Sequence, residues 1–250
     1  MYAFSATEMT HVGTVREVNE DAVLSRSATQ LWVVADGMGG YEAGDVASNM
    51  LVEALKNVEL NNSLASNIDE LETAVINVNQ KIIEYSNTVL DGRVFGSTVV
   101  LIYVYEDIGF VLWAGDSRLY RLKNRKLIRL THDHSQLQEM LDSNLLMEHE
   151  IDDYPDSNII TRAVGAEEKL RLDFFTFKIE EDDKFLLCSD GLYNAVADEV
   201  IESLLNSGSI NLNSKQLIDT ALENGANDNI SFIVIQNNDG QTITNVKYKD

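Results

Sequence analysis

The chain has 250 residues, 44% of them hydrophobic, so it is long and apolar enough to bury a core and is not a disordered segment. Its 19 basic and 41 acidic residues give a net charge of −22, which argues against nucleic acid and anionic lipid as partners. No apolar run reaches the length of a membrane span, the first residues lack a secretory signal pattern, and the single cysteine, Cys188, has no partner for an internal disulfide. These features predict a cytoplasmic protein without a membrane segment.

A charged stretch near the start, Arg16-Glu17-Val18-Asn19-Glu20-Asp21, precedes an apolar run that we expect to be a strand. It is either a surface turn or a guanidinium and two carboxylates at a strand end, and arginine presents a planar fork that matches phosphate oxygens. The next apolar run, 31–35, predicts a buried strand.

The strand over 31–35 ends on Asp36, which is followed by Gly37, Gly39 and Gly40. Glycines let a backbone come close to a ligand, and a carboxylate beside bare carbonyls suits a hard cation. A tight turn with a helix-capping aspartate is the alternative interpretation.

Helical spacing predicts helices over 43–57 and over 68–90, the second capped by Ser66 or Asn67 and ended by a turn at 91–92. Strand pairs follow over 98–105 with 110–114 and over 117–122 with 126–130. The link between the pairs contains Gly115-Asp116-Ser117-Arg118, a second carboxylate at a strand end.

The second half of the chain begins with a helix predicted from Ser135 to about 146, followed by an acidic, irregular flap at about 143–160. The remaining predicted strands are 172–179, 184–188 and 230–235, and the remaining helices are 198–205 and 215–223. The tail from 237 is either an edge strand, over 242–248, or loose. His132 and His134 are disfavoured as a metal pair, because they point opposite ways on an extended chain.

Acidic residues recur at strand boundaries, and packed sheets bring strand ends together, so we expect these carboxylates to converge. They are Glu20, Asp21, Asp36, Asp116, Asp190 and Asp228. Converged carboxylates repel one another unless they are protonated or bound to a metal. No Cys and His cluster offers soft ligands, so oxygen-only ligation favours Mg²⁺ or Mn²⁺ over zinc, copper or iron.

Eight short motifs occur in one order along nearly the whole chain. They are Arg16 with Asn19-Glu20-Asp21, Asp36-Gly37-Met38-Gly39-Gly40, Gly96-Ser97-Thr98, Gly115-Asp116-Ser117-Arg118, Leu130-Thr131 with Asp133-His134-Ser135, Ile160-Thr161-Arg162-Ala163-Val164-Gly165, Ser189-Asp190-Gly191 and Asp228-Asn229. In this order they resemble the protein phosphatase 2C family of metal-dependent serine/threonine phosphatases, in its compact bacterial form. The resemblance implies one α+β domain over 1–250, a four-layer α-β-β-α sandwich of two antiparallel sheets with helices on both outer sides, and a mobile flap at 143–160.

The resemblance also implies a site with two Mn²⁺ or Mg²⁺ ions. Asp36 would bridge them, with the Gly37 carbonyl on one and with Asp190 and Asp228 completing the other. Glu20 and Asp21 would act mainly through metal-bound waters. Asp116, together with Asp190, would match a third metal site.

The implied reaction is in-line attack on a phosphomonoester by a water held between the two metals, without a phosphoenzyme intermediate, while Arg16 holds the phosphate. Many relatives have histidine where this chain has Met38 or Tyr41. The leaving group would therefore take its proton from a metal-bound water or from another acid.

The implied partners are proteins phosphorylated on serine or threonine, including a cognate kinase or its substrates, and a monomer is expected. The alternative is a catalytically weak phosphoprotein-binding module on the same fold. A dinucleotide-binding enzyme is disfavoured because Glu42 stands where the last glycine of its motif belongs, and an acyl-transfer hydrolase because the motif around Ser117 lacks a second glycine.

Overall fold

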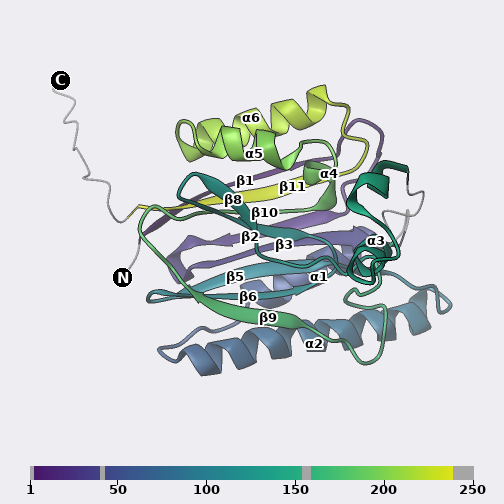
Figure 1. The fold of residues 1–250 in the computed structure, drawn as a ribbon. Coiled ribbons are helices and arrows are strands. Elements are labelled where there is room, and N and C mark those ends of the chain that lie inside the picture. The colour runs from purple at the N-terminus through teal and green to yellow at the C-terminus, as the bar shows by residue number, and fades with distance from the viewer. Residues whose placement is uncertain (1–2, 40–42, 154–158, 239–250) are drawn as a thin grey trace, which may run out of the picture.

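The computed structural model describes residues 3–39, 43–153 and 159–238. Two antiparallel sheets pack face to face, and helices cover the outer face of each (Figure 1). This arrangement confirms the predicted four-layer α-β-β-α sandwich.

The two sheets are built from segments that alternate along the chain. The first sheet has the order β1 (Phe4–His11), β11 (Ile230–Asn237), β10 (Lys184–Cys188), β7 (Arg118–Lys123) and β8 (Lys126–Arg129). The second has the order β2 (Asp21–Arg26), β3 (Leu31–Met38), β5 (Val99–Tyr105), β6 (Ile108–Ala114) and β9 (Asp173–Lys178), and the short β4 (Gly96–Ser97) pairs with the end of β3.

The helices form the two outer layers and a lateral segment. Helices α1 (Gly44–Lys56) and α2 (Leu64–Val89) cover the second sheet, whereas α4 (Asp190–Tyr193), α5 (Asp198–Leu205) and α6 (Ile210–Glu223) cover the first (Figure 1). Helix α3 (Gln136–Asp142) and the 3-10 turn η2 (Glu148–Asp153) lie at one side, and η1 (Ser27–Thr29) joins β2 to β3. No described helix combines the length and the apolarity that crossing a bilayer requires.

The central strands are apolar on both faces because both faces are covered. In β3, Trp32 and Val34 belong to the core between the sheets, together with Phe185 and Ile233 of the first sheet. The alternate residues of β3, such as Val33, pack against α1 and α2. A continuous apolar run is therefore the sequence signature of a strand in the middle of this sandwich.

Two element boundaries in the first half differ from the predictions. Strand β1 was not predicted, because a half-exposed edge strand has a mixed composition. Helix α2 begins at Leu64, after the cap Ser63, and not at residue 68. The predicted cap Asn67 is instead buried inside the helix, where its side chain donates to the hydroxyl of Tyr103 at 2.7 Å.

Further differences lie in the second half. Helix α3 ends at Asp142 and not near 146, and α6 begins at Ile210, after the cap Ser209, and not at 215. The predicted edge strand 242–248 lies outside the described residues, and so do residues 154–158 of the predicted flap.

Asn79 of α2 is fully buried, and its side chain forms hydrogen bonds with the segment that follows Val164. Its Oδ1 accepts a hydrogen bond from the Gly165 N–H at 2.6 Å, and its Nδ2 donates to the Glu167 carbonyl at 2.9 Å. Its neighbour Gln80 makes a similar bond, to the Glu168 carbonyl at 3.0 Å, but is exposed.

We predict that Asn79→Ala lowers the free energy of unfolding by about 1–3 kcal/mol, because the buried Gly165 N–H loses its partner and the partly buried bond to the Glu167 carbonyl is also lost. Gln80→Ala is the matched control and should cost less than about 0.5 kcal/mol, since water replaces the lost bond. Urea unfolding followed by circular dichroism measures both. Equal effects of the two substitutions would contradict the prediction.

Candidate active site

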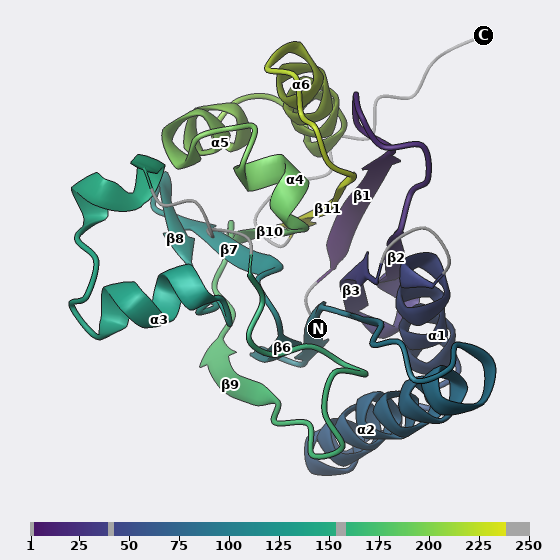
Figure 2. The ribbon, with the colours of Figure 1, turned by 90° about the vertical axis from the view of Figure 1, so that its right-hand side faces the viewer.

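The acidic residues expected to form the site border the ends of several strands and the start of α4, and α4 lies on the side of the molecule that faces the viewer in Figure 2. Asp36 lies near the end of β3, and Asp21, the first residue of β2, is its partner in the strand ladder. Asp116 lies between β6 and β7, Asp190 is the first residue of α4, and Asp228 comes just before β11. The two sheets thus contribute carboxylates from opposite sides.

The backbone around Asp36 is fixed by Thr98. The Asp36 N–H donates to the Thr98 hydroxyl at 3.1 Å, and the Thr98 N–H donates to the Asp36 carbonyl at 2.8 Å. The same buried hydroxyl lies 2.7 Å from that of Ser117, the residue after Asp116. Burial and then the charges of neighbouring aspartates, Asp21 first, raise the pKa of Asp36 well above its usual range.

Gly37 is required by a close approach of three backbone segments. A Cβ atom at this position would lie 2.2 Å from the Gly44 carbonyl oxygen and 2.5 Å from that of Glu20. The Gly37 N–H donates to the Glu20 carbonyl at 3.2 Å. The glycine therefore lets the first turn of α1 and the residue before β2 pack against the end of β3.

Asp21 and Asp116 each carry a buried carboxylate oxygen that has no hydrogen-bond partner in the described structure, and their side chains are only 9% and 4% exposed. The second oxygen of Asp21 accepts from the Ser189 hydroxyl at 2.8 Å. Burial raises the pKa of Asp21 to about 6, and burial followed by the charge of Asp133 raises the pKa of Asp116 to about 6. These unpaired oxygens would gain most from a bound cation.

Asp190 adds its carboxylate from the first sheet. Burial, and then the charges of Asp116 and Asp228, raise the pKa of Asp190 well above its usual range. In the described structure its Oδ2 accepts one side-chain hydrogen bond, from Asn194 at 3.3 Å.

Arg16 lies beside the acids and is more than half exposed. Its Nη2 donates to Asp228 Oδ2 at 2.7 Å, and this hydrogen bond is the main reason that the pKa of Arg16 is raised. Burial raises the pKa of Glu20, whereas the nearby charge of Arg16 lowers it. One guanidinium therefore contacts the acid cluster directly while presenting part of its surface to solvent.

Asn229 holds the loop that carries Arg16 and Glu20. Its Nδ2 donates to the carbonyls of Val12 at 2.9 Å and Val18 at 3.0 Å, and its Oδ1 accepts the Glu20 N–H at 2.8 Å. Asn229 belongs to one of the eight sequence motifs, but the sequence did not predict its role, because an asparagine next to a strand does not indicate which loop it will bind.

Three more residues of the motifs support the site. Ser117 and Ser189 bond Thr98 and Asp21, as described above. His134 is buried, its Nδ1 accepts the Gly115 N–H at 3.1 Å, and its ring stacks on that of Trp113. His134 therefore positions the backbone before Asp116.

The side chains do not by themselves complete a metal-binding group. Among the described residues, no three His, Cys, Asp or Glu side chains are arranged to hold a metal ion. Asp228 instead engages Arg16 with one oxygen and accepts the Asn229 N–H at 2.8 Å with the other. The structure thus brings Asp21, Asp36, Asp116 and Asp190 within electrostatic reach of one another, and pairs Asp228 with Arg16.

Comparisons with known proteins address this fold and site. The family model described as protein phosphatase 2C matches residues 11–224. The serine/threonine phosphatase stp of Listeria welshimeri is 34% identical over 234 residues, which cover 90% of this chain and 93% of the relative. The solved structure of PppA from Pseudomonas aeruginosa superposes with a TM-score of 0.86 at 37% identity, covering 94% of this chain and 97% of that one.

A third comparison concerns metals. The solved catalytic domain of the phosphatase PstP, in complex with two manganese ions, has a TM-score of 0.84 at 28% identity and covers 94% of this chain and 99% of that one. Fold, site and relatives define the class of this protein as a bacterial metal-dependent serine/threonine protein phosphatase. The chain belongs to the protein phosphatase 2C family.

We predict that, without divalent metal, the stability of the protein falls as the pH rises. Asp21 and Asp116 have folded-state pKa values of about 6, above the unfolded value, so their contribution is complete at low pH and is lost as the pH rises through 6. The loss should be about 3 kcal/mol or less per group. Thermal unfolding in a chelator between about pH 4 and about pH 8 measures it, with most of the loss expected below about pH 6.

Mn²⁺ should raise the melting temperature more at the upper end of this range, because the metal competes with protons for the same oxygens. Asp116→Asn removes one titration and should flatten the pH profile in the chelator. A profile that rises steadily with pH would contradict the prediction.

Proposed function

We propose that this chain hydrolyses phosphoserine and phosphothreonine esters in proteins, using two Mn²⁺ or Mg²⁺ ions bound at the acid cluster. The proposal rests mainly on the two buried carboxylate oxygens of Asp21 and Asp116 that have no hydrogen-bond partner in the described structure. They lie near Asp36 and Asp190, whose pKa values are raised well above the usual range. A single catalytic domain over 1–250 and phosphorylated protein partners, including a kinase or its substrates, are parts of the same proposal.

The donor set fits hard divalent cations. All the candidate ligands are oxygens, so they suit Mg²⁺ or Mn²⁺. We assign one pair of ions to the following residues: Asp36, the Gly37 carbonyl, Asp190, Asp228, Glu20 and Asp21. A third ion is assigned to Asp116 with Asp190. When bound, such ions lower the pKa of coordinated water and balance the charge of a phosphoryl group.

Arg16 is proposed to bind the phosphate of the substrate. Its guanidinium is more than half exposed and reaches the acid cluster, and its planar fork matches phosphate oxygens. A cation bound at Asp228 would free the guanidinium for this role, since it would replace Arg16 as the partner of that carboxylate.

The described residues contain no activated nucleophile at the cluster, which supports direct attack by water. Cys188 is fully buried, and burial raises the pKa of its thiol far above neutrality. The hydroxyls of Ser117 and Ser189 are held by Thr98 and Asp21. Met38 has no proton to give, so the leaving group must take its proton from another residue or from water. Tyr41 lies outside the described residues.

We predict that Asp36→Asn lowers Mn²⁺-dependent hydrolysis of a phosphothreonine peptide at least about 100-fold, because it removes a charge from the centre of the ligand set. Without metal, the variant should be no less stable than the parent, since a repelled buried charge is lost. Peptide assays and thermal unfolding measure the two effects. Asp219→Asn, on the exposed face of α6, is the control for loss of one charge. Full activity of the Asp36 variant would overturn the proposal.

We predict that Arg16→Ala raises the KM for a phosphopeptide about tenfold, since a charge-assisted contact to phosphate is lost. The KM of Arg16→Lys should lie between that of Arg16→Ala and that of the parent, because lysine keeps the positive charge but lacks the planar guanidinium. Calorimetric titration of Arg16→Ala with Mn²⁺ should show a smaller change in metal affinity. In the proposed site a cation replaces Arg16 as the partner of Asp228, so Arg16 is not needed to hold the metal. A variant that loses metal affinity but keeps its KM would contradict this assignment.

A further inference from the structure

A large open cavity adjoins the acid cluster on the side of α3. It has a volume of about 1440 Å³, above the range of about 300–1,000 Å³ that is usual for small-molecule pockets. Its lining includes Asp116 and Asn194, and Asn194 contacts the carboxylate of Asp190. The cavity is therefore continuous with the proposed catalytic site and large enough for a peptide segment.

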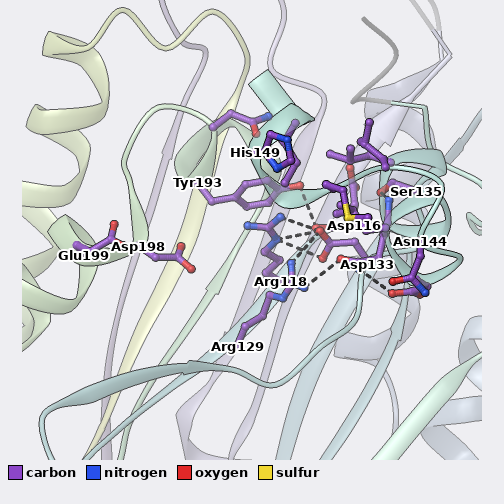
Figure 3. A pocket seen from close by; sticks show the side chains of 18 residues that line it. Asp116, Arg118, Arg129, Asp133, Ser135, Asn144, His149, Tyr193, Asp198 and Glu199 are labelled. Carbon is purple, nitrogen blue, oxygen red and sulfur yellow. Dashed lines mark hydrogen bonds and ion pairs between the residues drawn. The ribbon is translucent and has the colours of Figure 1, made fainter. Parts of the chain in front are cut away.

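The two arginines that line the cavity are already engaged. Arg118 donates from Nε and Nη2 to the carboxylate of Asp133 (Figure 3). Its Nη1 donates to the Tyr120 hydroxyl at 3.0 Å, and its Cζ lies 3.5 Å from the centre of the Tyr193 ring. Arg129 donates to Asp133 at 3.2 Å and to Gln138 at 3.0 Å. Both guanidiniums therefore already have partners within the protein, and Arg118 is largely buried.

The carboxylates at the start of α5 are not paired with described residues of opposite charge. Asp198 and Glu199 are exposed and lie at one side of the cavity, opposite Ser135 and Asn144 (Figure 3). Asp198 accepts a hydrogen bond from the neutral Tyr120 hydroxyl at 3.1 Å. Within the described part of the chain, neither carboxylate is paired with a lysine or an arginine.

The side of the cavity formed by α3 and the residues after it is mixed in character. Its apolar members are Leu137, Leu141, Leu146, Met147 and Ile151, and polar side chains such as Gln138, Asn144 and His149 lie among them. A lysine or arginine side chain suits a cavity that holds both apolar side chains and a pair of exposed carboxylates, because its long aliphatic stem packs on apolar surface while its charged end reaches an acid.

We propose that this cavity binds the segment of the phosphoprotein next to the phosphorylated residue, and that Asp198 and Glu199 recognise a lysine or arginine in that segment. The inference rests on the proposed function, because it names the substrate class for the same site. The net charge of −22 repels a phosphorylated segment, so a cation in the substrate offsets part of that repulsion and aids both encounter and binding.

The test uses phosphothreonine peptides that are neutral apart from the phosphate. Arginine is placed at one position at a time on either side of the phosphothreonine, and each peptide is compared with its glutamine and glutamate counterparts. At one or more positions, arginine should raise kcat/KM over glutamine about three- to tenfold at low salt, mainly through KM, and glutamate should lower it. About 0.5 M NaCl should shrink the preference.

The ratio of kcat/KM for the arginine peptide to that for the glutamine peptide is taken within each variant, so that any general loss of activity cancels. It should fall toward one in the double variant Asp198→Asn, Glu199→Gln. The amide oxygen introduced at position 198 would still accept the hydrogen bond from the Tyr120 hydroxyl. The matched control, Asp69→Asn with Glu70→Gln, removes the same charge from exposed positions of α2, on the opposite outer face, and should keep the ratio.

Two results would overturn the inference: equal kcat/KM for arginine and glutamine peptides at every position, or a preference that persists in the Asp198/Glu199 variant. Failure of the proposed function is distinguishable from both. It would show as no Mn²⁺-dependent phosphate release from any of the peptides by folded protein.

Discussion

Mutual repulsion among buried carboxylates is the constraint on which this structure depends. Asp36 lies at its centre, and the charges of Asp21, Asp190, Asp116 and Asp228 all raise its pKa, in addition to the effect of burial. Carboxylates that are shielded from water repel one another and move apart unless the fold holds them in position or a bound cation balances their charge. The surrounding structure can therefore be understood as the means by which the chain keeps these side chains together.

The two-sheet core provides the main restraint. Asp21 and Asp36 belong to neighbouring strands of one sheet, whereas Asp190 and Asp228 border β10 and β11 of the other. The apolar layer between the sheets is fully packed, so the facing strand ends cannot separate without opening that core. Buried hydroxyl and amide groups then fix the local structure. Thr98 bonds the backbone of Asp36, Ser189 bonds the carboxylate of Asp21, and Asn229 bonds the N–H of Glu20.

Charge also links the catalytic end to its surroundings. Arg16 provides positive charge where phosphate is expected to bind, while the two arginines of the neighbouring cavity share the carboxylate of Asp133, and Arg129 also donates to Gln138. The acids at the start of α5 are left without such partners among the described residues. In the roles that we propose, Arg16 attracts the phosphate of the substrate, and the acids of α5 select for cationic residues around the phosphorylated one.

By itself, the sequence determined the family and the chain order of most elements, and it singled out the acidic residues proposed for the site, because short motifs such as Ser189-Asp190-Gly191 and long apolar runs are local patterns. It did not reveal strand β1, whose mixed composition is that of an edge strand. Only the tertiary structure decided which side chains meet. Asp228 pairs with Arg16 and Asn229 with the carbonyls of Val12 and Val18, although more than 200 residues separate these partners. Such contacts depend on the pairing of β1 with β11, which brings the chain after His11 beside the chain before Ile230, and no local pattern encodes that pairing.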